Sequence, residues 1–248
     1  MKKISVLVML LLFLGIGFNG FSQNKKVALT TFWVTKHIGT SGLGGGPALA
    51  AAIASLSDNP DFNLQPVLDN FYNTFTKEYS KQFPFDLMPE EDVLKREEYI
   101  NYESRWGEDK DEDRHKMLQR YLTPEGYKPM IETLFKGKHN NTMRMLEIFK
   151  DADGVMFVTM GYNFIKKAVP FTAGVQAYVK IKLWNKEGKK VFSINELGTS
   201  KKSVAIVGGI PIMKTEKLLP LCESASEKLV ADLSKRLGKV AKKAAKKL

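Results

Sequence analysis

Cysteine, histidine and long apolar runs are all scarce in this chain of 248 residues. The one cysteine, Cys222, cannot form a disulfide within its own chain, so the fold must be stabilised by hydrophobic burial. The three histidines, His37, His115 and His139, lie far apart and in no paired ligand spacing, so the sequence predicts no zinc site. We therefore expect no metal and no cofactor, and we expect Cys222 to be a buried small hydrophobic residue.

Recognisable catalytic motifs are also missing. There is no Gly-x-Ser-x-Gly sequence and no cysteine beside a plausible base, so nucleophilic catalysis is not predicted. The alternating carboxylates of residues 109–113 are typical of a calcium loop, but Arg114 and Arg120 stand where an EF-hand needs glycine and glutamate. Residues 42–46 are rich in glycine but lack the Gly-Lys-Ser/Thr ending of a phosphate loop. We therefore expect a protein that is not an enzyme.

Three other interpretations of these segments stay open. Residues 109–113 could hold a divalent cation loosely. The paired glutamates at 90–91 and 97–98 could belong to an active site assembled from scattered acids, although a solvated helix surface also explains them. The loop at residues 42–46 follows a predicted strand and precedes a predicted helix, so its backbone N–H groups could bind a small anionic ligand.

The longest apolar run lies at the N-terminus. Lys2 and Lys3 precede an apolar stretch at residues 4–18, and small side chains follow before Gln23. This is the pattern of a cleavable secretory signal peptide, so we expect residues 1–22 to be removed. The run is shorter than the ~20 residues that span a bilayer, and no later segment is apolar enough to do so. We therefore expect an exported protein without a transmembrane segment, in the periplasm or associated with the envelope of a Gram-negative bacterium.

Positive charge is concentrated at the C-terminus. The formal net charge is +11, and removal of Lys2 and Lys3 with the signal leaves +9. Seven of these charges stand in the last fourteen residues, which leaves only +2 for the rest of the chain. Apolar residues recur between them at helical spacing, so we predict a basic amphipathic helix as an extension at residues 235–248. The seven cations are Lys235, Arg236, Lys239, Lys242, Lys243, Lys246 and Lys247.

This basic helix has three interpretations. Its polar face could simply be solvated, because cations are favourable at a helix C-terminus. It could attach the protein to an anionic lipid surface. It could also dock on residues 86–113, where twelve acidic residues against four basic ones give a net charge of −8. We expect an envelope protein or an anionic lipid surface as partner, and no nucleic acid, because the tail lacks interleaved aromatic residues.

Apolar periodicity predicts the fold class. Strands are expected at residues 26–34, 85–89 and 154–160, followed by a hairpin at 175–184 and 190–194 with an extension at 201–207. Helices are expected at residues 48–56, 61–83, 114–122 and 128–149, and from residue 217 or 220 toward the end. We predict an α/β fold at residues 23–234, a mixed sheet with a C-terminal β-meander flanked by helices. An acidic helical insertion is expected at about residues 86–150, and a long helix at the C-terminus.

Four segments of the chain carry a resemblance to known envelope proteins. They are the opening strand at residues 26–32, the strand and helix at 83–94, the Ala-Asp-Gly-apolar strand at 152–158 and the hairpin at 179–192. In this order they resemble the α/β envelope domains of the curli-secretion lipoproteins, the penicillin-binding-protein activator lipoproteins and the TolB N-terminal domain. The resemblance implies an exported, non-catalytic accessory or binding domain and carries over no catalytic residue. The lipidated cysteine and the long membrane hairpins of the curli pore have no counterpart, so pore formation is not implied.

Overall fold

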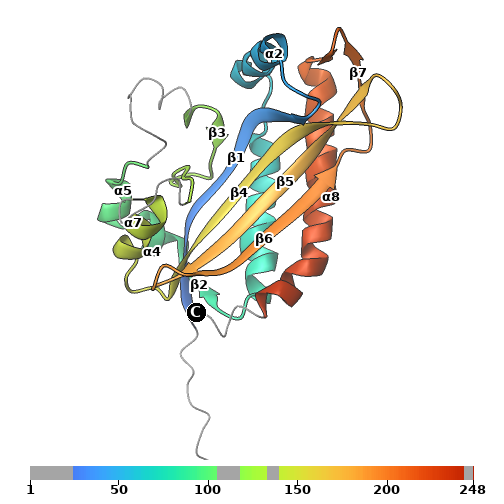
Figure 1. The fold of residues 1–248 in the computed structure, drawn as a ribbon. Helices are drawn as coiled ribbons and strands as arrows, with labels where there is room; N and C mark the ends of the chain where they lie inside the picture. Colours follow the sequence, from blue (N-terminus) through green and yellow to red (C-terminus); the bar gives the residue numbers. More distant parts are fainter. Residues whose placement is uncertain (1–24, 105–117, 133–139, 243–247) are drawn as a thin grey trace, which may run out of the picture.

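A mixed β-sheet with helices on both sides forms the centre of the molecule (Figure 1). The computed structural model describes residues 25–104, 118–132, 140–242 and 248. The strands are β1 (Lys26–Gly42), β2 (Asp86–Leu87), β3 (Tyr121–Leu122), β4 (Gly154–Lys166), β5 (Thr172–Asn185), β6 (Lys190–Thr199), β7 (Val204–Val207) and β8 (Ile210–Pro211). The helices are α2 (Pro47–Asp58), α3 (Gln65–Thr74), α4 (Glu90–Leu94), α5 (Glu97–Ile100), α7 (Asn141–Ile148) and α8 (Thr215–Ala241). The predicted α/β fold class is confirmed.

The strands follow the order β2-β1-β4-β5-β7-β8, with β3 on β1 and β6 on β5. Strand β1 runs parallel to β2 and β4, whereas the β4–β5–β6 meander is antiparallel. Side chains alternate between the two faces of each strand, so Val175, Val179 and Leu183 of β5 point to one face and Tyr178 and Lys180 to the other. The sheet therefore has one apolar face and one mixed face.

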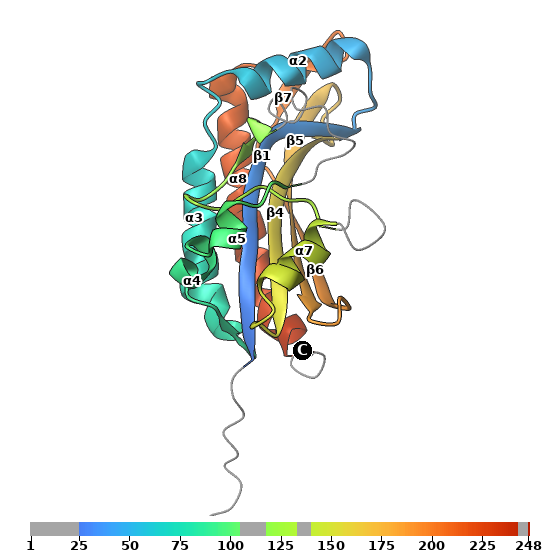
Figure 2. The ribbon, with the colours of Figure 1, turned by 90° about the vertical axis from the view of Figure 1, so that its left-hand side faces the viewer.

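Helices α3 and α8 cover the apolar face (Figure 2). The aromatic rings of Phe32, Phe71 and Phe75 cluster between β1 and α3, with centroids 5.0 to 6.3 Å apart. On α8, Leu229, Leu233 and Leu237 recur every four residues and are fully buried. This layer contains the larger of the two hydrophobic cores.

A smaller core lies on the other face, at the end of the sheet where β2 pairs with β1. Tyr99 of α5, Phe149 after α7 and Phe157 of β4 are buried there. Elsewhere in the described part of the chain, no helix packs on this face of β5 and β6 (Figures 1 and 2). We call the uncovered area the open face.

Three predicted elements differ from the structure. The first strand does not end at residue 34 but continues to Gly42 through register shifts, because it keeps pairing with β4 as far as Ile165. Residue 42, the first of the glycine-rich segment at 42–46, is therefore part of the strand. The helix predicted at 128–149 is confirmed only over α7, residues 141–148, and residues 128–131 are irregular. Of the helix predicted at 114–122, residues 121–122 form β3 instead.

The side chains of β1 explain why residues 128–132 are not helical. Thr31 donates its hydroxyl hydrogen to the carbonyl of Lys128 across 2.5 Å, and the Trp33 indole donates to the carbonyl of Met130 across 2.9 Å. Pro124 and Pro129 also lack the N–H group that a helix needs. These hydrogen bonds hold the segment beside β1, which the apolar spacing alone could not indicate.

Candidate binding groove on the open face

A hollow of about 380 Å³ lies on the open face, where β1, β4 and β5 run beside the short strand β3. Its size is in the range of small-molecule sites, about 300–1,000 Å³. Aromatic, amide and cationic side chains line it together. The side chains used below are those of Trp33, Thr35, His37, Arg120, Tyr121, Asn163 and Tyr178.

The floor of the hollow is formed where Tyr178 lies against Gly161. These two residues are direct neighbours in the β4–β5 ladder. A Cβ atom on Gly161 would stand 2.5 Å from the Tyr178 hydroxyl oxygen and 2.7 Å from Cζ. The absence of a side chain at residue 161 therefore lets the Tyr178 ring lie across β4, which turns a flat sheet surface into a hollow with an aromatic floor.

Trp33 forms a fixed wall. Its indole N–H is held by the carbonyl of Met130, and its ring meets the ring of Tyr121 edge-on with centroids 4.8 Å apart. The indole is buried and its orientation is set from two sides. Such a ring can offer its edge or face to a ligand without losing much conformational entropy.

The polar rim carries His37 and Arg120. Burial, and then the nearby positive charge of Arg120, lower the pKa of His37 below its usual range, while Asp58 opposes this shift. This shift favours the neutral imidazole, which can accept a hydrogen bond. The Arg120 Nε atom lies 3.5 Å from an Asp58 carboxylate oxygen and makes no hydrogen bond among the described residues.

A second hollow, also of about 380 Å³, continues the first toward β6. The two share Asn163 and Tyr178, so we treat them as one groove across β4, β5 and β6. Lys180 lies 5.5 Å from the centroid of the Tyr178 ring and adds a cation beside it. Glu196 also borders this hollow, but its carboxylate accepts a hydrogen bond from Arg236 of α8.

A larger hollow of about 470 Å³ lies at the other end of β1, beside β2. The hydroxyl groups of Tyr72 and Tyr127 lie 3.2 Å apart in it, and burial raises the pKa of both. These two hydroxyl groups thus already bind each other. The groove on the open face has an aromatic floor that rests on Gly161 and extends over two adjoining hollows, so we regard it as the better candidate.

The structure also places the cations predicted as surface-attachment residues. Helix α8 is continuous through residue 235, and its apolar side remains fully buried at Leu237 and Ala241. Lys235, Lys239 and Lys242 are exposed. Arg236 is bound to Glu196 across 2.6 Å, and Lys243, Lys246 and Lys247 lie outside the described residues. Only a basic edge of the helix is therefore available to a partner, and not its apolar face.

The remaining sequence candidates do not come together. In the glycine-rich loop, residues 44–46 are exposed and lead into α2, and the helix has no side-chain N-cap. The paired glutamates stand in the first turns of α4 and α5. Cys222 is fully buried, and burial raises the pKa of its thiol. His115, His139 and residues 109–113 lie outside the described residues.

Comparisons with known proteins give no match, either to a protein-family model or to a curated protein. Within the ranges that the structure describes, no three His, Cys, Asp or Glu side chains form a group that could hold a metal ion. The helices of the same ranges include none that is long and apolar enough to cross a bilayer.

Sequence reasoning missed the groove. In the first strand, Phe32 and Val34 alternate with Trp33 and Thr35, which line the groove. All four positions are buried, so the sequence of this strand did not indicate which face carries a site. The hairpin of β5 and β6 was correctly predicted, and its alternating pattern gives it one polar face. Which strands stand beside that face, and what leaves it uncovered, depends on the strand order.

Proposed function

We propose that this protein is an exported, non-catalytic binding protein of the bacterial cell envelope and that the groove on the open face holds its ligand. The observation that carries the proposal is the groove itself, in which an aromatic floor and wall, Tyr178 and Trp33, stand beside an amide, a neutral imidazole and a guanidinium group. Aromatic faces with a few hydrogen-bonding groups suit a ligand that has both apolar ring faces and hydroxyl groups. A carbohydrate of the envelope has this chemistry.

Binding rather than catalysis is supported by how the ionisable groups of the groove are used. The carboxylate of Glu196 is held by Arg236, and Arg120 lies beside Asp58. These charged side chains already have charged partners, which favours recognition of a ligand that leaves unchanged.

Calorimetric titration with oligosaccharides tests this proposal. The probes are disaccharide fragments of peptidoglycan and core oligosaccharides of lipopolysaccharide, added to the mature protein. We expect binding to at least one of them, weakened tenfold or more by Tyr178→Leu and by Asn163→Ala, because each removes a contact from the shared part of the groove. Ser193→Ala, on the same face but outside both hollows, is the matched control. Absence of binding to every probe, or equal affinity of the Tyr178 variant, would overturn the proposal.

The basic edge of α8 supports a second contact, with an acidic partner in the envelope. Lys235, Lys239 and Lys242 are exposed along one edge, while the apolar side of the helix is occupied by the core. Such a contact is electrostatic, so it should weaken steeply as salt is added. At physiological ionic strength, charges are screened over about 8–10 Å. The docking partner could equally be the acidic segment 86–113 of a neighbouring chain.

Capture from envelope extracts tests the second contact. Replacement of Lys235, Lys239 and Lys242 by Glu should abolish retention of partners at low salt, whereas the same change at Lys77, Lys150 and Lys189 should not. These control lysines are also exposed but lie on other elements. Equal loss in the two triple variants would show that only the net charge matters, and the proposed contact would then be wrong.

A further inference from the structure

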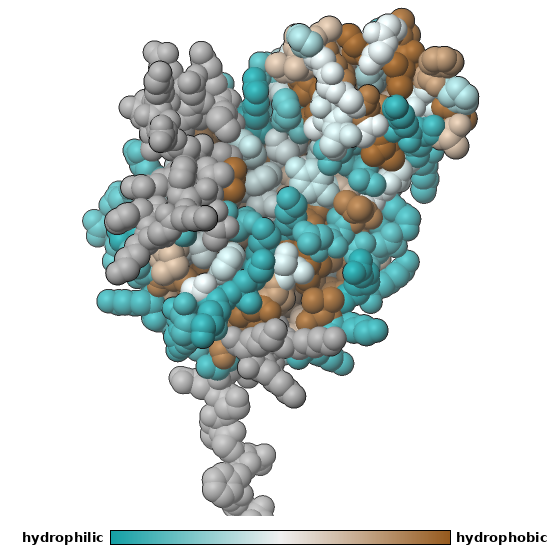
Figure 3. Space-filling view, in the orientation of Figure 1, coloured by the Kyte–Doolittle hydropathy of each residue, from teal (hydrophilic) through white to brown (hydrophobic). Residues whose placement is uncertain are grey.

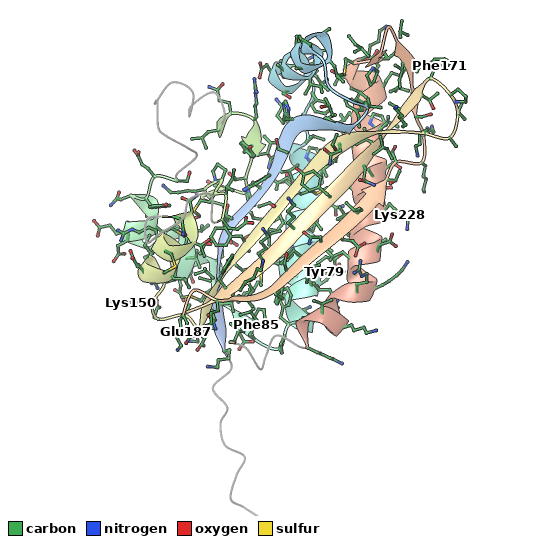
Figure 4. All side chains as sticks on the ribbon, in the orientation of Figure 1. Tyr79, Phe85, Lys150, Phe171, Glu187 and Lys228 are labelled. Atoms are coloured by element: carbon green, nitrogen blue, oxygen red, sulfur yellow. The ribbon has the colours of Figure 1, made fainter. Side chains whose placement is uncertain are left out.

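Large apolar side chains are exposed at one end of the sheet, in the turn after β4 and in the β7–β8 hairpin. Phe171, Val207 and Val169 are 80%, 68% and 63% exposed, the three highest values among the large hydrophobic residues of the described chain. The space-filling view shows hydrophobic surface gathered at this end, at the upper right, where Figure 4 labels Phe171 (Figures 3 and 4). We call residues 166–172 and 204–213 the hairpin end.

The two turns form one surface. The backbone N–H of Ile206 donates to the carbonyl of Phe171 across 2.7 Å, and Thr172 pairs with Ala205. Behind the exposed tips, four partly buried side chains continue into the main core. They are Ile206, Ile210, Ile212 and Met213. The exposed apolar groups thus stand on a packed base that holds them outward.

The backbone at Phe171 is strained. Its φ angle is 56°, the only positive value among the described residues that are not glycine. A bulky aromatic residue in the left-handed region is a genuine outlier and costs of order 1 kcal/mol or more. An exposed phenylalanine gains little from solvent in return, so the conformation points to a contact outside the chain that the ring is set to make.

Lysine side chains surround the apolar tips. Residues 165–172 and 199–217 contain six lysines and a single acidic residue, Glu216. Five of the lysines, Lys166, Lys201, Lys202, Lys214 and Lys217, are exposed. The sixth, Lys167, donates to the carbonyl of Ser200 across 2.5 Å and links the turn after β4 to the β6–β7 connection. The hairpin end and the residues that flank it therefore combine an apolar centre with a strongly basic rim.

From this arrangement we propose that the hairpin end docks on an anionic phospholipid membrane, with Phe171, Val169 and Val207 in the interface and the lysines at the headgroups. Apolar side chains with a rim of flexible cations suit the boundary between acyl chains and anionic headgroups. A second copy of the chain would bring the same basic rim against itself and be repelled. Charge complementarity therefore selects an anionic lipid surface as the occupant.

The docked orientation follows from the course of α8. This helix begins at Thr215, next to the hairpin end, and its 27 residues span about 40 Å to the opposite end of the sheet, where β1 starts (Figures 1 and 2). When a flat bilayer lies against the hairpin end, the basic edge at Lys235, Lys239 and Lys242 is at the far end of α8, away from the membrane. The two contacts can then form together, and the inference does not depend on the groove.

Vesicle binding by the mature protein tests the inference. Co-sedimentation with vesicles of phosphatidylglycerol and phosphatidylethanolamine should be weakened tenfold or more by Phe171→Ser combined with Val207→Ser, because each side chain loses its apolar burial. Reversal of charge at Lys166 and Lys202 should weaken binding by a similar factor. Ile100→Ser, which removes a 54% exposed apolar side chain from another part of the molecule, should have no effect.

A fluorescent label at the tip identifies the contact directly. Phe171→Cys can be labelled with an environment-sensitive dye, because Cys222 is fully buried. We expect a blue shift of the dye on addition of the anionic vesicles, and no shift for the same dye at Leu197→Cys on the open face.

The proposal is overturned if wild-type protein does not bind these vesicles, if the tip variants bind as well as wild type, or if only the Lys235, Lys239 and Lys242 variant loses binding. Loss of self-association instead of vesicle binding would identify a second copy as the occupant and also overturn it.

Discussion

Arg236 of α8 donates to the carboxylate of Glu196 on β6 across 2.6 Å, and so joins the basic helix to the sheet. The two side chains differ in their surroundings, because 60% of the arginine side chain is exposed but only 11% of the glutamate. A cation that the sequence assigns to surface attachment therefore has a structural role. The guanidinium group of Arg236 neutralises the Glu196 carboxylate, which is mostly buried beside the helix.

Removal of Arg236 should consequently destabilise the protein. In Arg236→Ala the Glu196 carboxylate keeps its burial and loses its charged donor, which we expect to lower the free energy of unfolding by about 1–2 kcal/mol. Lys235→Ala should change it by less than about 0.5 kcal/mol, because Asp232 keeps its other partner, Lys228. Urea denaturation of both variants measures the difference, and equal values would contradict the role of Arg236.

The contact of α8 with the sheet depends on the absence of a side chain at Gly198. A Cβ atom there would lie 2.2 Å from the carbonyl oxygen of Ala225 and 2.4 Å from the backbone N of Leu229. Gly198→Ala must push the helix backbone away from β6, and we expect a loss of about 3 kcal/mol or more, or failure to fold.

Gly45→Ala is the control for that substitution. Gly45 lies in the exposed loop before α2, where the nearest atom to an added Cβ is 4.0 Å away. Its midpoint of thermal unfolding should stay within a few degrees of wild type. A Gly198→Ala protein that is as stable as this control would show that α8 does not rest on the sheet at that point.

The core elements of this fold could be predicted because their signals are local. The continuous apolar run of β4 and the alternation of β5 both follow from the pleat of a strand, and the structure confirms them. The long helix at the C-terminus was likewise evident from its repeat of leucines. It begins at Thr215, slightly earlier than predicted.

The groove and the hairpin end could not be predicted, because both depend on which elements are neighbours. Trp33 lines a hollow only because β4 and β5 continue the sheet beside β1 and no helix covers that area among the described residues. Val207 lies in the predicted strand extension at 201–207. A short apolar strand at the end of a sheet has the same sequence pattern as a buried strand, so the sequence could not indicate that Val207 is exposed. Exposure is a property of the assembled sheet.

Arg96 and Asp151 form an ion pair with two hydrogen bonds, of 2.6 and 2.8 Å, which closes the smaller core. The hydrogen bonds from Arg96 hold the pKa of Asp151 below its usual range near 3.8. A carboxyl group whose pKa is lower in the folded state stabilises the protein above its pKa in the unfolded chain. That contribution is lost as pH falls through the folded-state pKa.

Asp151→Asn should therefore be less stable than wild type at pH 7, and the difference should shrink as pH falls from about 5 toward 3. Because 55% of the Asp151 side chain is exposed, the difference at pH 7 should be no more than about 1 kcal/mol. Urea denaturation at several pH values gives both quantities. A difference that stays constant down to pH 3 would mean that the ion pair does not contribute.

The basic helix was predicted as an extension that begins at residue 235, yet its apolar side chains remain in the core beyond that position. Leu237 is fully buried against the main core, as is Ala241. Leu237→Ala should cost about 2–4 kcal/mol, the usual range for removing a buried leucine side chain.

A chain that ends at Ser234 should be destabilised at least as much, because it loses Leu237, Ala241 and the Arg236 pair together. A chain that ends at Lys242 keeps all three, so it should be clearly more stable than the chain that ends at Ser234, although it loses the contact of Leu248 with the main core. Equal stability of the two truncated chains would show that the helix beyond Ser234 is not part of the folded domain.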